Sequence, residues 1–313
     1  MSQNSTHTTN MVMDIENGNS VLLTFGKPGR TLKRKIALTG FICRVVFFLI
    51  FNPIFLTRVK YKPNLWKRRK ASAMKVMRLF FPFYSNECRT KSTDHGQVIV
   101  INHPTLNDPI CAILYAVYSN PDCEVIVPVN LPWYESICRY RIKLSKLGIK
   151  IVPILTPETA LRLGPSEDDS AARVQAALMK NYVAEFTSTL ACGGIAIVAQ
   201  QATRKRYVFN NVAQSETGND ILSTISLILV AIRRSGLLEQ AIFTPVGVVP
   251  HKIDAKAKLN PFRKYTLNVG EPILAADLAA IKNAAKRPAD LYILRRLLDL
   301  LPIEYHFENQ PYK

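Results

Sequence analysis

From about residue 95 onward, the hydrophobic pattern of the chain alternates between two kinds of segment. Longer stretches with helical spacing of apolar residues, such as 171–194, separate short runs rich in β-branched residues. Such runs are typical of buried strands, and they lie at 97–101, 124–129, 149–154, 195–199, 243–249 and 265–270. Strands that alternate with helices predict an α/β domain with a layered mixed sheet flanked by helices.

Three further helices are expected in this part of the chain. The apolar run 221–234 is too short to cross a bilayer, so we expect a buried helix there. Amphipathic spacing predicts two more helices, near 274–286 and 288–300. The helix over 171–194 should end at Gly193 and Gly194, because glycine commonly ends helices.

The first 60 residues follow a different pattern. Residues 1–30 are polar and lack the order of a signal peptide, so we expect a flexible tail. Residues 36–56 form an apolar stretch of 21 residues, nominally long enough to span a bilayer. Arg44 lies inside this stretch and Pro53 near its end, and both disfavour a simple membrane-spanning helix. The pattern leaves open whether the stretch spans the bilayer or dips into it.

The next segment alternates large apolar residues with cations, and this pattern is typical of a helix lying in an anionic membrane interface. The apolar members are Trp66, Met74, Met77, Phe80 and Phe81, and the cations are Lys67, Arg68, Arg69, Lys70, Lys75 and Arg78. The alternative is a helix that packs on the protein's own domain and leaves its basic face in solvent. We therefore predict a flexible tail over 1–30, a membrane-docking helical segment over 31–90 and an α/β domain over 91–313.

The charge balance narrows the choice of partner. Lys and Arg number 41 against 23 Asp and Glu, which gives a net charge of +18 and favours a polyanion. Zinc-ligand spacing and aromatic RNA-binding patterns are absent from the sequence, so we expect no nucleic acid partner and favour anionic lipids. The six scattered cysteines are typical of reduced thiols, and no cluster suggests a metal. We predict a membrane-associated protein on the cytoplasmic face.

One short motif, NHPTLND, carries candidate chemistry at the end of the first strand. On an unbroken helix His103 and Asp108 would lie about 140° apart. Pro104 disfavours a helical His103 and suits the first turn of a helix that follows. We therefore expect His103 in an extended turn and Asp108 in the first helical turn, within reach of the ring. Such a pair can act as a general base; alternatively, Asp108 caps the helix and His103 is an ordinary turn residue.

This motif, from Asn102 to Asp108, resembles the first conserved block of the glycerophospholipid acyltransferases. That family transfers fatty acyl groups from acyl-CoA or acyl-ACP (acyl carrier protein) to lysophosphatidic acid and related lipid acceptors. The resemblance covers about residues 95–272. It implies that His103 is the general base on the acceptor hydroxyl, that Asp108 orients it, and that no cofactor is needed beyond the donor substrate.

Later blocks of the family are matched in part. The P-E-G-T-R block falls on 200–204, where Thr203 and Arg204 match and Gln201 replaces the Glu. The resemblance implies that Arg204, with Thr203 and Gln201, contacts the acceptor's phosphate. The apolar block FTPVGVVP carries Pro245, which would shape the wall beside the acyl chain or, alternatively, be an edge-strand proline.

The departures from the family keep two other functions open. In the second block Pro153 stands where an Arg is expected, and Lys150 or Lys146 could replace that cation. One alternative is therefore an acyltransferase for an acceptor without a phosphate, such as an amine-bearing lipid or a glycolipid. The other is a catalytically silent membrane lipid-binding protein. A serine hydrolase is disfavoured because the chain lacks a G-x-S-x-G motif.

Overall fold

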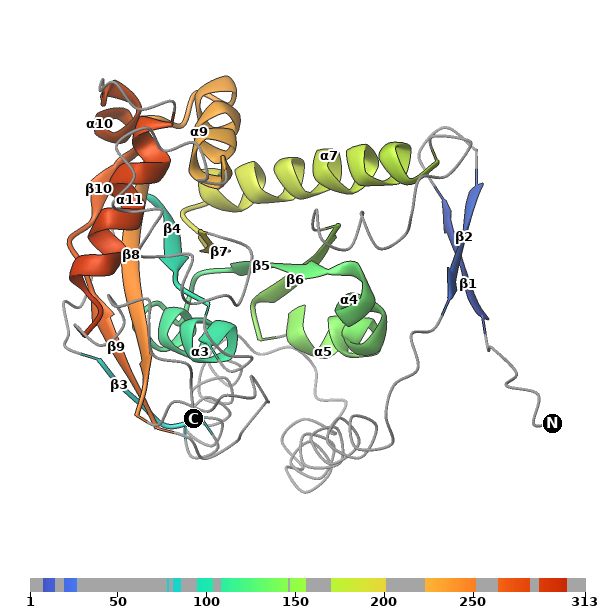
Figure 1. The fold of residues 1–313 in the computed structure, drawn as a ribbon, viewed down its shortest axis with the longest axis horizontal. Helices are drawn as coiled ribbons and strands as arrows, with labels where there is room; N and C mark the ends of the chain where they lie inside the picture. Colours follow the sequence, from blue (N-terminus) through green and yellow to red (C-terminus); the bar gives the residue numbers. More distant parts are fainter. Residues whose placement is uncertain are drawn as a thin grey trace, which may run out of the picture. The chain divides into compact units, whose positions relative to one another are not determined.

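The structure is a computed structural model, and it describes residues 8–14, 20–26, 78, 81–85, 95–103, 108–145, 147–155, 170–200, 223–251, 264–281 and 287–302. The chain divides into two compact units, one formed by 1–69 with 155–179 and the other by 70–154 with 180–313. The first unit contains an antiparallel pair of strands, β1 (Thr8–Asp14) and β2 (Ser20–Gly26) (Figure 1). The domain limits at residues 30 and 90 stay predictions.

The second unit is built on one large mixed sheet (Figure 1). Its strands are β3 (Phe83–Ser85), β4 (Gly96–Ile101), β5 (Val125–Asn130), β6 (Ile149–Ile154), β7 (Ile195–Ala199), β8 (Ala241–Pro250), β9 (Tyr265–Val269) and β10 (Ile273–Leu274). They lie in the order β3-β9-β8-β4-β7-β5-β6, and β10 also pairs with β8. The five neighbouring strands β8, β4, β7, β5 and β6 are parallel to one another. The strands β9 and β10 run antiparallel to β8.

The helices complete the α/β class that the sequence predicts. They are α3 (Asp108–Ser119), α4 (Leu131–Ile137), the 3-10 turn η2 (Cys138–Tyr140), α5 (Arg141–Ser145), α7 (Ser170–Ala191), α9 (Thr224–Arg234), α10 (Ala275–Ala280) and α11 (Pro288–Asp299). The six predicted strands are confirmed as β4 to β9, and the helices expected at 171–194 and 288–300 are confirmed as α7 and α11. The helix expected near 274–286 is shorter than predicted, because α10 ends at Ala280 and the backbone of Ile281 is extended. The helix expected at 221–234 is confirmed as α9, which is only partly buried because Leu227 and Val230 are exposed.

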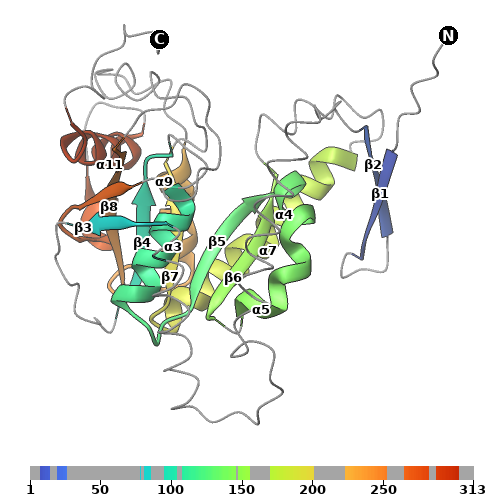
Figure 2. The ribbon, with the colours of Figure 1, turned by 90° about the horizontal axis from the view of Figure 1, so that it is seen from below.

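Both faces of the parallel sheet are covered. On one face Val98 and Val100 of β4 and Val198 of β7 belong to a core cluster with side chains of α7, α9, α10 and α11. On the other face α3 contacts β4, β5 and β7, and α4 contacts β5 and β6 (Figure 2). A sheet buried on both faces needs apolar residues at successive positions, which is why these strands read as continuous hydrophobic runs.

The end of α7 shows how two glycines place the start of β7. Gly193 has a φ of +69°, which favours glycine, and its N–H donates to the Leu190 carbonyl at 2.9 Å. The N–H of Gly194 donates to the Thr189 carbonyl at 2.8 Å, completing the bond pattern of a Schellman motif. A Cβ on Gly194 would lie 2.5 Å from the Thr189 methyl, so no larger residue fits. The predicted helix stop is confirmed.

The predicted membrane-docking segment lies mostly outside the described residues. Within the part of the chain that is described, no helix has the length and apolar character to cross a bilayer. Arg78 is described, and its guanidinium lies over the rings of Phe83 at 4.9 Å and Tyr118 at 5.1 Å. Such cation–π contacts stabilise packing, so this end of the basic segment packs on the protein's own sheet and on α3.

Candidate active site at the carboxyl edge of the sheet

The connections after β4 and β7 diverge at the carboxyl edge of the sheet. β4 leads to α3 on one face, whereas its neighbour β7 leads to α9 on the opposite face. In open α/β sheets, ligands bind where the connections of adjacent strands part in this way. The residues that directly follow β4 and β7 are therefore the first candidates for a functional site.

His103 and Asp108 meet at this edge. His103 follows the end of β4 by two residues, and Asp108 is the first residue of α3. Nδ1 of His103 lies 3.4 Å from Oδ2 of Asp108. The Asp108 side chain is fully buried, and 18% of the His103 side chain is exposed. The predicted placement of the two residues is confirmed, whereas Pro104 lies outside the described residues.

This geometry can support general-base chemistry. A carboxylate at Nδ1 fixes the tautomer of the ring and leaves Nε2 available to a substrate proton. A contact of 3.4 Å is long for a hydrogen bond, but catalytic hydrogen bonds without substrate are often long and shorten when it binds. The positive end of the α3 dipole also stabilises the charge of Asp108.

Cys111 lies one helical turn after Asp108 and does not provide a nucleophile. Its thiol is fully buried. Burial and, to a lesser extent, the negative charge of Asp108 raise the pKa of this thiol well above its usual range. Because the thiolate is the nucleophilic form, the buried thiol of Cys111 is not a candidate nucleophile.

Asn102 fixes the end of β4 directly before His103. The β4–β8 ladder ends where Ile101 lies opposite Val246. Beyond it, Nδ2 of Asn102 donates to the Val248 carbonyl at 3.0 Å, and the Val248 N–H donates to Oδ1 of Asn102 at 2.6 Å. The side chain thus satisfies both backbone groups of one β8 residue and holds the position from which His103 leaves the strand.

Two further polar residues are fully buried near the end of β7, and the sequence did not single them out as a pair. Nε2 of Gln200 donates to Oδ1 of Asp290 at 3.2 Å. Gln200 directly follows β7, at the position of the proline in the P-E-G-T-R block. Asp290 lies in the first turn of α11, where an acidic residue reads as a local helix cap. The residues that Asp290 contacts lie far from it in the sequence, so no local pattern could have indicated these contacts.

The other predicted site residues are placed in part. Gln201, Thr203 and Arg204 lie outside the described residues. Pro245 is buried in β8, which pairs with β4 on one side and with β9 and β10 on the other. The edge-strand alternative for Pro245 is therefore wrong. The proline stands between the β10 and β9 pairings, where the ladder changes partner and a missing N–H is tolerated.

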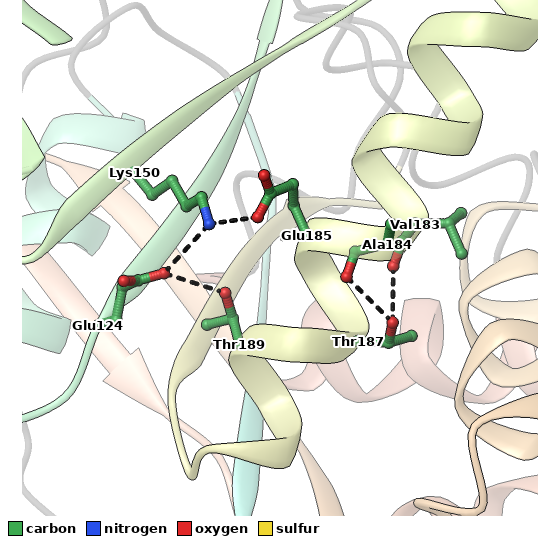
Figure 3. Close-up of polar contacts among 7 residues, drawn as sticks. All are labelled: Glu124, Lys150, Val183, Ala184, Glu185, Thr187 and Thr189. Atoms are coloured by element: carbon green, nitrogen blue, oxygen red, sulfur yellow. Dashed lines mark hydrogen bonds and ion pairs between the residues drawn. The ribbon is translucent and has the colours of Figure 1, made fainter. Parts of the chain in front are cut away.

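Lys150, a possible substitute for the missing arginine of the second block, lies away from His103. It is the second residue of β6, at the amino end of the strand, and it pairs with Glu185 of α7 and with Glu124 at 3.8 Å (Figure 3). Glu124 also accepts a hydrogen bond from Thr189 at 3.2 Å. Lys150 therefore fastens α7 to the sheet and is not part of the candidate site. Lys146 lies outside the described residues.

No model of a known protein family matches the sequence, and no curated protein matches it either. Inference about function therefore rests on the residues at the carboxyl edge. Among the residues described, no group of three or more His, Cys, Asp or Glu side chains is placed to hold a metal ion.

Proposed function

We propose that the protein is an O-acyltransferase. It moves a fatty acyl group from a thioester donor, acyl-CoA or acyl-ACP, to the hydroxyl of a lysophospholipid or related glycerolipid acceptor. The observation that carries the proposal is the contact between partly exposed His103 and buried Asp108 at the carboxyl edge. The resemblance of NHPTLND to the glycerophospholipid acyltransferases supplies the reaction class.

The proposed reaction needs one base and one orienting carboxylate. Nε2 of His103 accepts the proton of the acceptor hydroxyl as that oxygen attacks the thioester carbonyl and forms the new C–O bond. Asp108 stabilises the imidazolium that results. The tetrahedral intermediate then collapses, the C–S bond breaks, and the leaving sulfur takes the proton from His103. Proton transfer of this kind contributes about 10²–10⁴-fold to the rate.

The acceptor's phosphate is assigned to the segment after β7. Under the proposal Arg204 binds the phosphate with two parallel N–H groups, Thr203 adds a hydroxyl, and Gln201 adds an amide. Support comes from the described residue Gln200, whose backbone N–H donates to the Ile101 carbonyl at 3.2 Å, two residues before His103. The residue directly before this segment is therefore bonded to the end of the strand that leads to His103. Pro245 is proposed to shape the wall along the acyl chain.

We also propose that the protein docks on the cytoplasmic face of an anionic membrane through residues 31–69. The net charge of +18 and the apolar and basic composition of this segment support docking. An amphiphilic acceptor could then reach His103 from the bilayer. Deleting 31–69 leaves Arg78 and β3 in place, and it should abolish cosedimentation with vesicles that contain anionic lipids. Complete release of the intact protein by moderate salt would instead mean that no apolar segment is inserted.

An acceptor screen tests the reaction. Full-length protein is incubated with oleoyl-CoA or oleoyl-ACP and with lysophosphatidate, lysophosphatidylethanolamine or a monoacyl glycolipid, and released thiol and acylated product are measured. We expect thiol release that depends on lysophosphatidate. Release with the amine-bearing lipid or the glycolipid alone would refute the phosphate assignment. No release with either donor and any acceptor would refute the enzyme and favour a lipid-binding protein.

A further inference from the structure

The outward side of α9 combines exposed apolar residues with cations. Leu227 is 60% exposed and Val230 is 45% exposed, and Arg233 and Arg234 in the last turn are exposed as well. Residues three or four positions apart share one face of a helix. Leu227, Val230 and Arg234 therefore form one stripe, with Arg233 at its side, and α9 itself contains no acidic residue. We call this stripe the outer face of α9.

The packing of α9 does not require its outer face. The helix is held by its other side, where Ile225, Ile228 and Ile232 are buried in the core cluster. Cations at the end of a helix stabilise its dipole, which explains the two arginines but not the exposed leucine and valine. Large apolar residues beside cations are typical of a helix on an anionic bilayer, where the apolar groups enter the interface and the cations reach the phosphates.

The apolar end of the outer face lies towards the carboxyl edge of the sheet. Oδ2 of Asp290 accepts the Ser226 N–H in the first turn of α9 at 3.0 Å. Oδ1 of the same carboxylate accepts the side-chain amide of Gln200, which directly follows β7, at 3.2 Å. Leu227 follows Ser226 in the chain, so it is near the edge at which His103 leaves β4, whereas the arginines are at the far end of the helix.

We propose that the outer face of α9 is a second membrane contact, which lies on an anionic phospholipid bilayer when residues 31–69 dock. The net charge of +18 attracts anionic headgroups and opposes another copy of the chain, which carries the same charge. So small a surface binds weakly alone, and the docked segment makes its binding intramolecular. The inference rests on the proposed membrane docking but not on the acyl transfer. Under the proposed function, the contact brings the carboxyl edge close to the lipid acceptor.

Quenching of tryptophan fluorescence in the full-length protein locates the contact. The chain has two tryptophans, so a variant with Trp66→Phe, Trp133→Phe and Leu227→Trp has its only indole at position 227. The matched control carries Trp66→Phe alone and reports from Trp133, which is 42% exposed on α4, on the opposite face of the sheet (Figure 2). Vesicles of phosphatidylcholine and phosphatidylglycerol with brominated acyl chains should quench the emission from position 227 and leave that of Trp133 unchanged.

Substitutions of the outer face measure its contribution to binding. Leu227→Gln with Val230→Gln should weaken partition to such vesicles about tenfold, because less apolar area enters the interface. Arg233→Gln with Arg234→Gln should also weaken it about tenfold, and this loss should disappear at high salt, which screens the headgroups. Trp133→Gln makes the same change from an apolar side chain to an amide on the opposite face, and it should leave partition unchanged.

The outcomes separate this contact from the other proposals. Vesicle binding without quenching at position 227, or an unchanged partition of Leu227→Gln with Val230→Gln, refutes the contact and leaves docking through 31–69 intact. Quenching at position 227 by a protein that releases no thiol supports the contact, although the acyltransferase fails. A full-length protein that binds no vesicles overturns both the docking and the contact. If Leu227→Gln with Val230→Gln converts a dimer to a monomer in analytical ultracentrifugation without vesicles, the outer face binds a second copy and the membrane contact is wrong.

Discussion

Asp108 and Asp290 are both fully buried at helix N-termini, but they face different partners. Asp290 accepts two backbone N–H groups of α9 at 2.7 and 3.0 Å, together with a serine hydroxyl and a glutamine amide. Asp108 faces the imidazole of His103 at the longer distance of 3.4 Å, and that ring is partly exposed.

The difference separates a structural carboxylate from one suited to catalysis. Backbone N–H groups neither gain nor lose protons, so the charge of Asp290 is committed to holding α9. An imidazole can take a proton from a substrate, and the charge of Asp108 then stabilises the imidazolium. Burial of an aspartate therefore does not make it a candidate catalytic residue, whereas a titratable partner that solvent can reach does.

The largest expected effect is on catalysis by Asp108→Asn. The neutral amide cannot stabilise the imidazolium and can offer its own N–H to Nδ1, which favours the unproductive tautomer. We expect kcat to fall by about 10²–10⁴-fold, measured by thiol release from oleoyl-CoA. A kcat within twofold of wild type would show that Asp108 is a helix cap like Asp290.

Asp290→Ala should act mainly on stability. Two backbone N–H groups and the Ser226 hydroxyl lose their acceptor, so we expect the free energy of unfolding to fall by about 2–4 kcal/mol, measured in urea. Asp277→Asn serves as the control, because Asp277 is an exposed aspartate in the first turn of α10. A loss below about 0.5 kcal/mol would mean that water replaces the carboxylate at the start of α9.

Asn102→Ala should lower both kcat and the free energy of unfolding, each by less than in the two variants above. The N–H and carbonyl of Val248 lose their partners, and the strand end before His103 is no longer fixed. We expect about 1–3 kcal/mol less stability and a kcat about tenfold lower. Asn102→Asp retains the acceptor for the Val248 N–H and is the matched comparison. An Asn102→Ala kcat equal to that of wild type would show that this amide does not position His103.

The smallest effect is expected at Lys150. Lys150→Met should cost at most about 1 kcal/mol, because the ion pair with Glu185 is partly exposed. The hydrogen bond to Glu185 is the main cause that raises the pKa of Lys150 above its ordinary value of 10.5. The stabilisation should therefore be constant below about pH 9 and disappear as the pH rises through that raised pKa. Urea unfolding of wild type and Lys150→Met between pH 7 and 11 measures this, and a difference that grows with pH would contradict it.

Much of the fold could be predicted because it depends on local patterns. Residues 195–199 are apolar at successive positions since β7 is buried on both faces, and Gly193 with Gly194 ends α7 for reasons of backbone geometry. The spacing of His103 and Asp108 is also a local feature, so the meeting of the two side chains could be anticipated.

Contacts between distant segments could not be predicted in this way. Asp290 lies 65 residues from Ile225 in the chain, and its own helix offers a plausible local role. The strand β10 has two residues and β3 has three, too few for an alternating pattern to be visible. The apolar residues of the run 221–234 gave no sign of which would face solvent, and the packing of α9 leaves Leu227 and Val230 exposed.

The central claim is that His103 removes the acceptor's proton, and the most direct test is the rate of lysophosphatidate-dependent thiol release by His103→Ala. His251→Ala is the matched control, since His251 is an exposed histidine at the end of β8, the strand next to β4. We expect a rate about 10²–10⁴-fold below wild type for His103→Ala and an unchanged rate for His251→Ala, with both variants folded by circular dichroism. A folded His103→Ala variant that releases thiol at the wild-type rate would contradict the account.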